Sequence, residues 1–203
     1  DWLATRFMED GWSLKKLHRR ILMSATYRQS STRPMDEQIA EVDPQNVWLW
    51  RMNPRRLSGE EIHDAMLVAS GEMATDKRAI YKNVKRNKLD PLLAAFDFPD
   101  RVRSQGKRHR TTTSPQALLL MNNSWMHNRA ERLAKEFAED SVDELVDQVH
   151  PRLFHRSATE WDRERAAGFI SAYPSESVDA NDQEAKTALL HAYLCSSEMI
   201  YVD

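Results

Sequence analysis

Helix-start signals recur along this chain and favour a mostly helical fold. Ser58 and Glu61, and again Ser141 and Glu144, have the spacing of a capping box, in which the serine oxygen accepts a free backbone N–H group and the glutamate reaches back to the cap. Apolar residues at helical spacing follow each box, and Ser114 before a proline marks a further helix start. We predict a mostly α fold of seven to nine helices in an irregular bundle.

The expected elements follow from this periodicity. Residues 1–27 should form a hairpin of two helices, and residues 28–45 a long polar loop with a short helix around 37–42. Residues 79–84 have an extended pattern, which indicates an irregular arm or a short two-stranded element. Residues 117–121 are apolar all round, so we expect a fully buried helix there, and the last helix should cover about 182–196.

The six tryptophans are interpreted mainly as core residues because they recur at helical spacing with other apolar residues. Trp48 and Trp50, beside Arg51, could instead stack on a sugar or on a partner. No apolar run approaches the roughly 18 residues that a membrane span needs. We therefore expect neither a membrane span nor a membrane-interface anchor in this segment.

Glycine and cysteine are scarce, which excludes several kinds of binding site. The 203 residues include 5 glycines and contain no GxGxxG or GxxxxGK[ST] phosphate loop. The single cysteine, Cys195, excludes an internal disulfide, a zinc site of several thiolates and a CxxCH haem attachment. The seven histidines form no HExxH pattern, so we expect no metal and no cofactor in this segment. His63 and Asp64 are adjacent helical residues that point about 100° apart, which does not favour an acid–base pair.

The charges are divided unevenly along the chain. Residues 76–110 contain 11 basic and 4 acidic side chains, whereas residues 131–203 contain 7 basic and 16 acidic ones. The two regions could pack against each other, or the basic region could face an anionic partner. Nucleic acid is disfavoured as that partner because the basic region has few aromatic residues and the chain has a net charge of −2.

We expect the polar arm over residues 81–116 to be the functional surface. Arginine forks, threonine hydroxyls and the helix start at Ser114 could together bind phosphate, sulfate or carboxylate. Alternatively, salt bridges tie the arm to the core, with Asp97 and Asp100 receiving Arg86 or Arg108. The candidate residues of this surface are Tyr81, Arg86, Asn87, Asp97, Asp100, Arg108, Arg110, Thr113 and Gln116.

Six segments, in order, resemble one known family. They are SATYRQSS at 24–31, the stretch from DPQNVWLW to VASGEM at 43–73, YKNVKRN at 81–87, FDFPD at 96–100, RTTTSPQALLLMNN at 110–123 and SSEMIYVD at 196–203. They resemble the planctomycete-type domain of unknown function 1553, found at the C-terminal end of large proteins that also carry a cytochrome-c-like module. The resemblance implies an exported or periplasmic protein, with haem in an upstream domain and none here. It supplies no catalytic residues, and the family often has arginine where His63 stands.

Two functional hypotheses remain open from the sequence. In the first, residues 1–203 form a single helical domain, the C-terminal part of a longer multidomain chain, which interacts with upstream domains of the same chain or binds an anionic ligand or polysaccharide. In the second, the chain is an enzyme, hydrolytic or redox-linked, with an Arg/Asp/Thr cleft. An unpaired carboxylate in a concave pocket would favour the enzyme, whereas paired and buried side chains would favour the first hypothesis.

Overall fold

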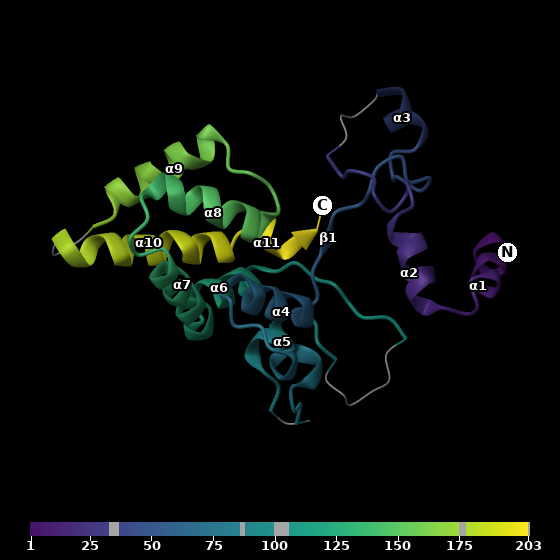
Figure 1. Cartoon of the computed structure of the whole chain (residues 1–203), viewed down its shortest axis with the longest axis horizontal. Helices are drawn as coiled ribbons and strands as arrows, with labels where there is room; N and C mark the ends of the chain where they lie inside the picture. Colours follow the sequence, from purple (N-terminus) through teal and green to yellow (C-terminus); the bar gives the residue numbers. More distant parts are fainter. Residues whose placement is uncertain (33–36, 86–87, 100–105, 175–177, 203) are drawn as a thin grey trace. The chain divides into compact units, whose positions relative to one another are not determined.

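The structure is a computed structural model that describes residues 1–32, 37–85, 88–99, 106–174 and 178–202 (Figure 1). These residues contain eleven α-helices, two short 3-10 turns and one pair of two-residue strands, so the mostly α fold is confirmed and the predicted number of helices was too low. By its contacts the chain divides into two compact units, residues 1–55 and 56–202. The single-domain organisation stays a prediction, and each unit is described separately.

The first unit contains the helices α1 (Trp2–Glu9), α2 (Leu14–Leu22) and α3 (Glu37–Val42). As predicted, α1 and α2 form a hairpin, in which Gly11 adopts a left-handed φ of +71° and the Ser13 hydroxyl accepts the N–H of Lys16 at the start of α2. Arg20 bridges the two helices through Asp10, 2.8 Å away. Neither α1 nor α2 fully buries a side chain, and the two helices also meet where Arg20 lies over the ring of Trp2.

Two buried polar residues organise the loop after α3. The carboxylate of Asp43 accepts the backbone N–H groups of Val47 and Trp48, both at 2.8 Å. The amide of Asn46, itself at a φ of +53°, donates to the carbonyl of Arg51 at 2.7 Å. These bonds hold Trp48 outward, where 74% of the residue is exposed.

The second unit begins in the strand β1 (Arg55–Arg56), which pairs with β2 (Tyr201–Val202) near the C-terminus. Its remaining elements are α4 (Gly59–Ala69), the 3-10 turns η1 (Thr75–Lys77) and η2 (Ala79–Tyr81), α5 (Pro91–Ala95), α6 (Ser114–Asn122), α7 (Ser124–Glu136), α8 (Val142–Phe154), α9 (Glu160–Ala172), α10 (Val178–Leu194) and α11 (Ser197–Ile200).

Helix α4 has both of its predicted ends. Ser58 and Glu61 form the capping box, and Glu61 accepts the Ser58 N–H at 2.7 Å. At the other end Gly71 takes a left-handed φ of +68°, and the N–H groups of Gly71 and Glu72 return to the carbonyls of Val68 and Leu67. This is a Schellman motif, in which glycine avoids the steric cost of that conformation.

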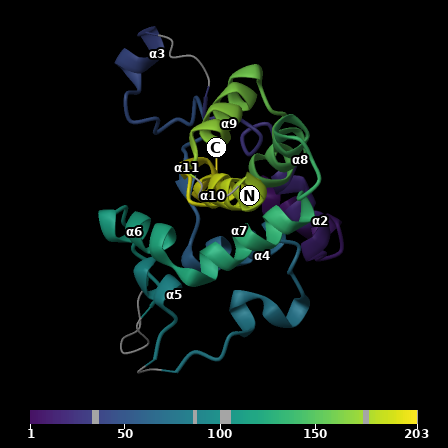
Figure 2. The same ribbon diagram turned by 90° about the vertical axis from the view of Figure 1, so that its left-hand side faces the viewer.

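The core of the second unit lies mainly where α7 and α10 pack against each other, with α8 and α9 on the other side of α10 from α7 (Figures 1 and 2). Its fully buried side chains include Met126, Leu133, Leu145 and Leu190. Lys186 of α10 is 2% exposed and donates from Nζ to the carbonyls of Ala138 and Asp140, both at 2.8 Å. A cation at the C-terminal end of α7 is favourable because the helix dipole is negative there.

Two sequence predictions about local structure and packing were wrong. Residues 79–84 form no strand: residues 79–81 are the 3-10 turn η2, and residues 82–84 are irregular. Helix α6 is not fully buried, because only Gln116 and Leu120 are buried in it, while Leu118 and Met121 are more than half exposed. An all-apolar run does not determine which side of a short helix meets the core.

The tryptophans are mostly surface residues rather than core residues. Trp2, Trp12, Trp48 and Trp161 are each at least 60% exposed, and the other two are partly buried. Helical spacing with other apolar residues therefore did not locate the core in the first unit, whose helices α1 and α2 bury no side chain.

Candidate functional site

Asp97, two residues beyond α5, is the centre of the predicted arm. Its left-handed φ of +62° turns the chain away from the helix. The carboxylate accepts the backbone N–H and the hydroxyl of Thr111, each at 2.8 Å, and the guanidinium of Arg56 at 2.7 Å. We call these three residues, Arg56, Asp97 and Thr111, the Asp97 clamp.

The charge state of the clamp follows from these contacts. Burial alone would raise the pKa of Asp97, but the two hydrogen bonds from Thr111 and the positive charge of Arg56 outweigh it and lower the pKa. The Arg56 side chain is 4% exposed, donates also to the Leu57 carbonyl and lies over the ring of Phe96. Asp97 is therefore an ionised structural acceptor whose two oxygens are both in use.

Gln116 connects the end of the arm to the start of α6 by hydrogen bonds. It is buried, and its amide nitrogen donates to the Ala95 carbonyl at 2.9 Å and to the Thr111 hydroxyl at 3.3 Å. Its amide oxygen accepts the N–H of Thr113 at 3.1 Å. Thr113, rather than the predicted Ser114, is the N-cap residue, and the helix begins at Ser114.

Residues 106–113 form an irregular, non-helical segment that we call the basic strap. All eight residues are exposed. They include Lys107, Arg108 and Arg110 and no acidic residue. Besides the Asp97 clamp, Arg108 pairs with Glu60 at 2.6 Å, and the Thr112 hydroxyl bonds to that of Tyr201 at 2.9 Å. The strap is thus attached to α4, to the end of α5 and to β2, while Lys107 and Arg110 are exposed.

The predicted site residues are brought together only in part. Asp97, Arg108, Thr113 and Gln116 lie in or beside the strap, and Arg110 is exposed on it. Tyr81 is 60% exposed on η2. Arg86, Asn87 and Asp100 lie outside the described residues.

The expected ion-pair partners were wrong where the structure describes them. Asp97 receives Arg56, and Arg108 pairs with Glu60, so the expected pair of Asp97 with Arg108 does not form. The expected pairing with Arg86 lies outside the described residues. Arg56 and Glu60 were not among the candidate residues. The polar Pro-Arg-Arg stretch before Ser58 was a signal for Arg56, but its partner lies 41 residues away in the chain and no local pattern identifies it.

His63 and Asp64 differ from the expectation as well. The His63 ring nitrogen Nδ1 lies 3.1 Å from the Asp64 carboxylate, although adjacent helical side chains diverge. His63 is buried and stacks on Trp125 with 5.0 Å between ring centroids, and burial lowers its pKa. Asp64 also accepts the N–H of Ala79 at 2.7 Å, so the pair ties η2 to α4.

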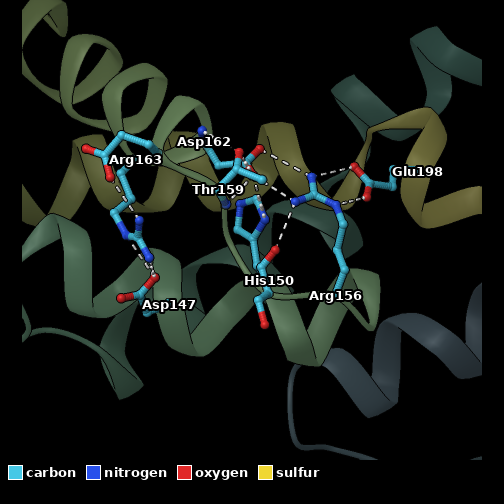
Figure 3. A network of polar contacts seen from close by, with 9 residues as sticks. Asp147, His150, Arg156, Thr159, Asp162, Arg163 and Glu198 are labelled. Carbon is cyan, nitrogen blue, oxygen red and sulfur yellow. Dashed lines mark hydrogen bonds and ion pairs between the residues drawn. The ribbon is translucent and has the colours of Figure 1, made fainter.

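A second polar cluster joins α8, α9 and α11 (Figure 3). Arg156 donates to Asp162 at 2.7 Å and to Glu198 at 2.6 Å, and Asp162 also accepts the N–H and hydroxyl of Thr159. The hydrogen bond to Arg156 is the main reason that the pKa of Asp162 is lowered far below its usual range. Every carboxylate of this cluster is engaged, which indicates a structural joint.

His150 lies against this joint and is 1% exposed. Its Nδ1 is 3.8 Å from the nearest Asp162 oxygen, beyond hydrogen-bond distance, and its ring meets Phe154 and Tyr193 edge to face. Burial, which disfavours the charged imidazolium, lowers the pKa of His150.

Within the described ranges, no three His, Cys, Asp or Glu side chains gather as metal ligands would. The described helices also include none with the length and apolar character to cross a membrane.

The fold and the site define a helical module with an anchored basic strap. A family model described as PSD1, protein of unknown function (DUF1553), matches residues 1–170. The chain belongs to this family, which the sequence motifs had indicated. No curated protein and no solved structure matches it.

Proposed function

We propose that this chain is an interaction module that binds an anionic partner through the basic strap, residues 106–113. The observation that supports this function is the Asp97 clamp, which attaches the strap while all eight of its residues remain exposed. A strap with only a packing role would bury side chains of its own. This one presents Lys107 and Arg110, whose exposed positive charges are suited to sulfate, phosphate or carboxylate groups.

The enzyme hypothesis has less support at this site. It needs a carboxylate free to exchange a proton, but both oxygens of Asp97 accept hydrogen bonds and its pKa is lowered. A carboxylate in this state is a poor general acid or base at neutral pH. The interaction hypothesis is therefore the better supported of the two.

Binding to dextran sulfate, with uncharged dextran as the control ligand, tests the proposal. The variant K107Q/R110Q removes two exposed charges of the strap, whereas K77Q/K135Q removes two exposed charges elsewhere. We expect the strap variant to weaken dextran sulfate binding about tenfold or more and the control variant to change it less than twofold. We also expect wild-type binding to weaken as NaCl is raised, because salt screens exposed charges.

Asp97→Asn provides a second variant that keeps every strap charge. If the clamp presents the strap, this variant should bind dextran sulfate several-fold more weakly at unchanged net helix content by circular dichroism. Equal binding by the wild type, K107Q/R110Q and K77Q/K135Q would refute the proposed function.

The family resemblance supports three further proposals about context. We propose that the protein is exported or periplasmic, that haem is held by an upstream domain, and that this module contacts upstream domains of the same chain. Fractionation of cells that express the full-length protein, with haem staining of the purified chain, tests the first two. Cross-linking of that chain followed by peptide mapping tests the third.

A further inference from the structure

The outer side of α6 exposes apolar residues directly after the basic strap. Leu118 is 55% exposed and Met121 is 60% exposed. Gln116 and Leu120, by contrast, are buried. At about 100° of rotation per residue, Leu118 and Met121 lie roughly 140–200° around the helix axis from Gln116. Ala117 is exposed as well, and we call Ala117, Leu118 and Met121 the α6 face.

Hydrogen bonds hold the basic strap against the first turn of α6. The side-chain amide of Gln116 donates to the Thr111 hydroxyl at 3.3 Å and accepts the Thr113 N–H at 3.1 Å. At a rise of about 1.5 Å per residue, Met121 lies about 10 Å along the helix from Ser114. The basic strap and the α6 face are therefore neighbours, and the structure describes every residue between them.

The segment that contains the strap and the α6 face has no negative charge of its own. Residues 106–130 include four residues of Lys or Arg and no Asp or Glu. Arg108 pairs with Glu60 of α4, and Lys107 and Arg110 are exposed. Positive charge thus adjoins exposed apolar side chains, and a partner that complements both must carry anionic and apolar groups together.

We propose that the anionic partner of the basic strap is a polypeptide, an acidic amphipathic segment whose carboxylates pair with Lys107 and Arg110 and whose apolar side chains cover the α6 face. This inference rests on the proposed function, because the strap supplies the charged half of the contact. Exposed apolar residues that are grouped together and bordered by polar ones are typical of protein contacts, and methionine adapts its shape to such partners.

Two other anionic partners complement this surface less well. A sulfated polysaccharide carries charge along its length but no aliphatic side chains to cover Leu118 and Met121. Helices that bind anionic lipid surfaces combine a basic face with an apolar face that includes Trp or Phe, whereas α6 has nine residues and no aromatic one. An acidic polypeptide provides both kinds of group at side-chain spacing.

Fluorescence anisotropy of a labelled peptide titrated with the full chain tests this proposal. The probe is the peptide (Glu-Leu-Glu-Glu-Leu-Leu-Glu)₃, whose pattern of polar and apolar residues is that of an amphipathic helix. One control peptide replaces every leucine by serine, and the other replaces every glutamate by lysine. We expect each control peptide to bind at least tenfold more weakly than the probe.

The variant L118Q/M121Q removes the apolar side chains of the α6 face and leaves every charge of the strap in place. It should weaken binding of the probe about tenfold or more. The matched control V68Q/I80Q replaces residues of α4 and η2 that are 55% and 59% exposed, and it should change binding less than twofold. Glutamine is a good helix former and all four positions are exposed, so both variants should keep the wild-type helix content by circular dichroism.

Dextran sulfate distinguishes failure of this inference from failure of the proposed function. Because it has charge but no apolar side chains, L118Q/M121Q should leave its binding unchanged within twofold, whereas K107Q/R110Q should weaken binding of both dextran sulfate and the probe. If L118Q/M121Q binds the probe as the wild type does, while K107Q/R110Q still loses dextran sulfate, this inference is overturned and the proposed function stands.

Three further results would also overturn the inference. The first is equal affinity for the probe and the serine peptide, or no binding of the probe at millimolar concentration. The second is binding of the chain to phosphatidylglycerol vesicles that L118Q/M121Q abolishes, because the α6 face would then contact a membrane. The third is a dimer of the free chain in analytical ultracentrifugation that L118Q/M121Q dissociates, because a second copy would then cover the face.

Discussion

Replacement of Asp97 perturbs the clamp at the point where three interactions meet. Asp97→Ala removes the acceptor of both Thr111 bonds and leaves the guanidinium of Arg56, whose side chain is 4% exposed, without its carboxylate. Hydrogen bonds to charged groups contribute about 1.5–3 kcal/mol each, and an uncompensated buried charge adds to the loss. Alanine at the left-handed φ of +62° costs about 1 kcal/mol more.

Solvent reduces this sum because the Asp97 side chain is 17% exposed and water can replace part of what is lost. We expect Asp97→Ala to lower the free energy of unfolding by about 3 kcal/mol. Asp97→Asn should cost about half as much, since asparagine tolerates the left-handed region and its amide oxygen can still accept a bond.

Urea unfolding followed by circular dichroism at 222 nm measures these free energies. An equal slope m for the variants and the wild type verifies that the same unfolding transition is compared. Thr111→Val is the matched control, because it removes the hydroxyl bond and retains the backbone N–H bond. A double-mutant cycle with Arg56→Met isolates the ion pair. Hydrogen exchange should become faster at the Thr111 amide in Asp97→Ala. A free energy within about 0.5 kcal/mol of the wild type, with the Thr111 amide still protected, would refute the structural role of the clamp.

Three further changes test other parts of the fold. Burial lowers the pKa of His150, so below about pH 6.5 the unfolded chain binds a proton more strongly than the folded chain does. The free energy of unfolding should therefore decrease as the pH falls below about 6.5. Urea unfolding from pH 5 to pH 8 should show a weaker pH dependence for His150→Phe than for the wild type. Lys186→Met should lower the free energy of unfolding by about 2–4 kcal/mol, because the carbonyls of Ala138 and Asp140 after α7 lose their hydrogen-bond donor. A decrease below about 0.5 kcal/mol would contradict that role. Gly59→Ala should lower the free energy of unfolding by about 1 kcal/mol, because the added Cβ would lie 3.2 Å from the Phe96 Cβ and 3.3 Å from the Leu93 Cα. A thermal midpoint at or above that of the wild type would show that α5 shifts to accept the methyl group without cost.

The local features of the helices were predictable because their causes lie within a few residues. The boxes at Ser58 and Ser141 begin α4 and α8 where the sequence places them, since each cap satisfies N–H groups three positions away. The short helix at 37–42 also has the expected bounds. Helix α8 continues through Pro151 to Phe154, and Leu153 beyond the proline is buried.

The candidate site was predictable as a segment but not as a set of contacts. The charge pattern indicated the segment 81–116, within which the structure describes the helix α5 and the irregular strap at 106–113. Asp97 accepts an arginine there, but that arginine is Arg56 rather than the expected Arg108. The partners Arg56, Glu60 and Tyr201 reach the arm from distant parts of the chain. Among several arginines of equal chemistry, only the folded backbone decides which one comes close enough to pair.

Sequence by itself thus determined where several of the helices start and that the fold is mostly α. Tertiary structure decided which faces of those helices are buried, as the exposed Leu118 and Met121 of α6 demonstrate. It also decided that Asp97 pairs with Arg56 and that Lys107 and Arg110 of the strap are exposed. The physical reason is range: caps and turns are satisfied by neighbours in the chain, whereas burial and ion pairing depend on which distant surfaces the fold brings together.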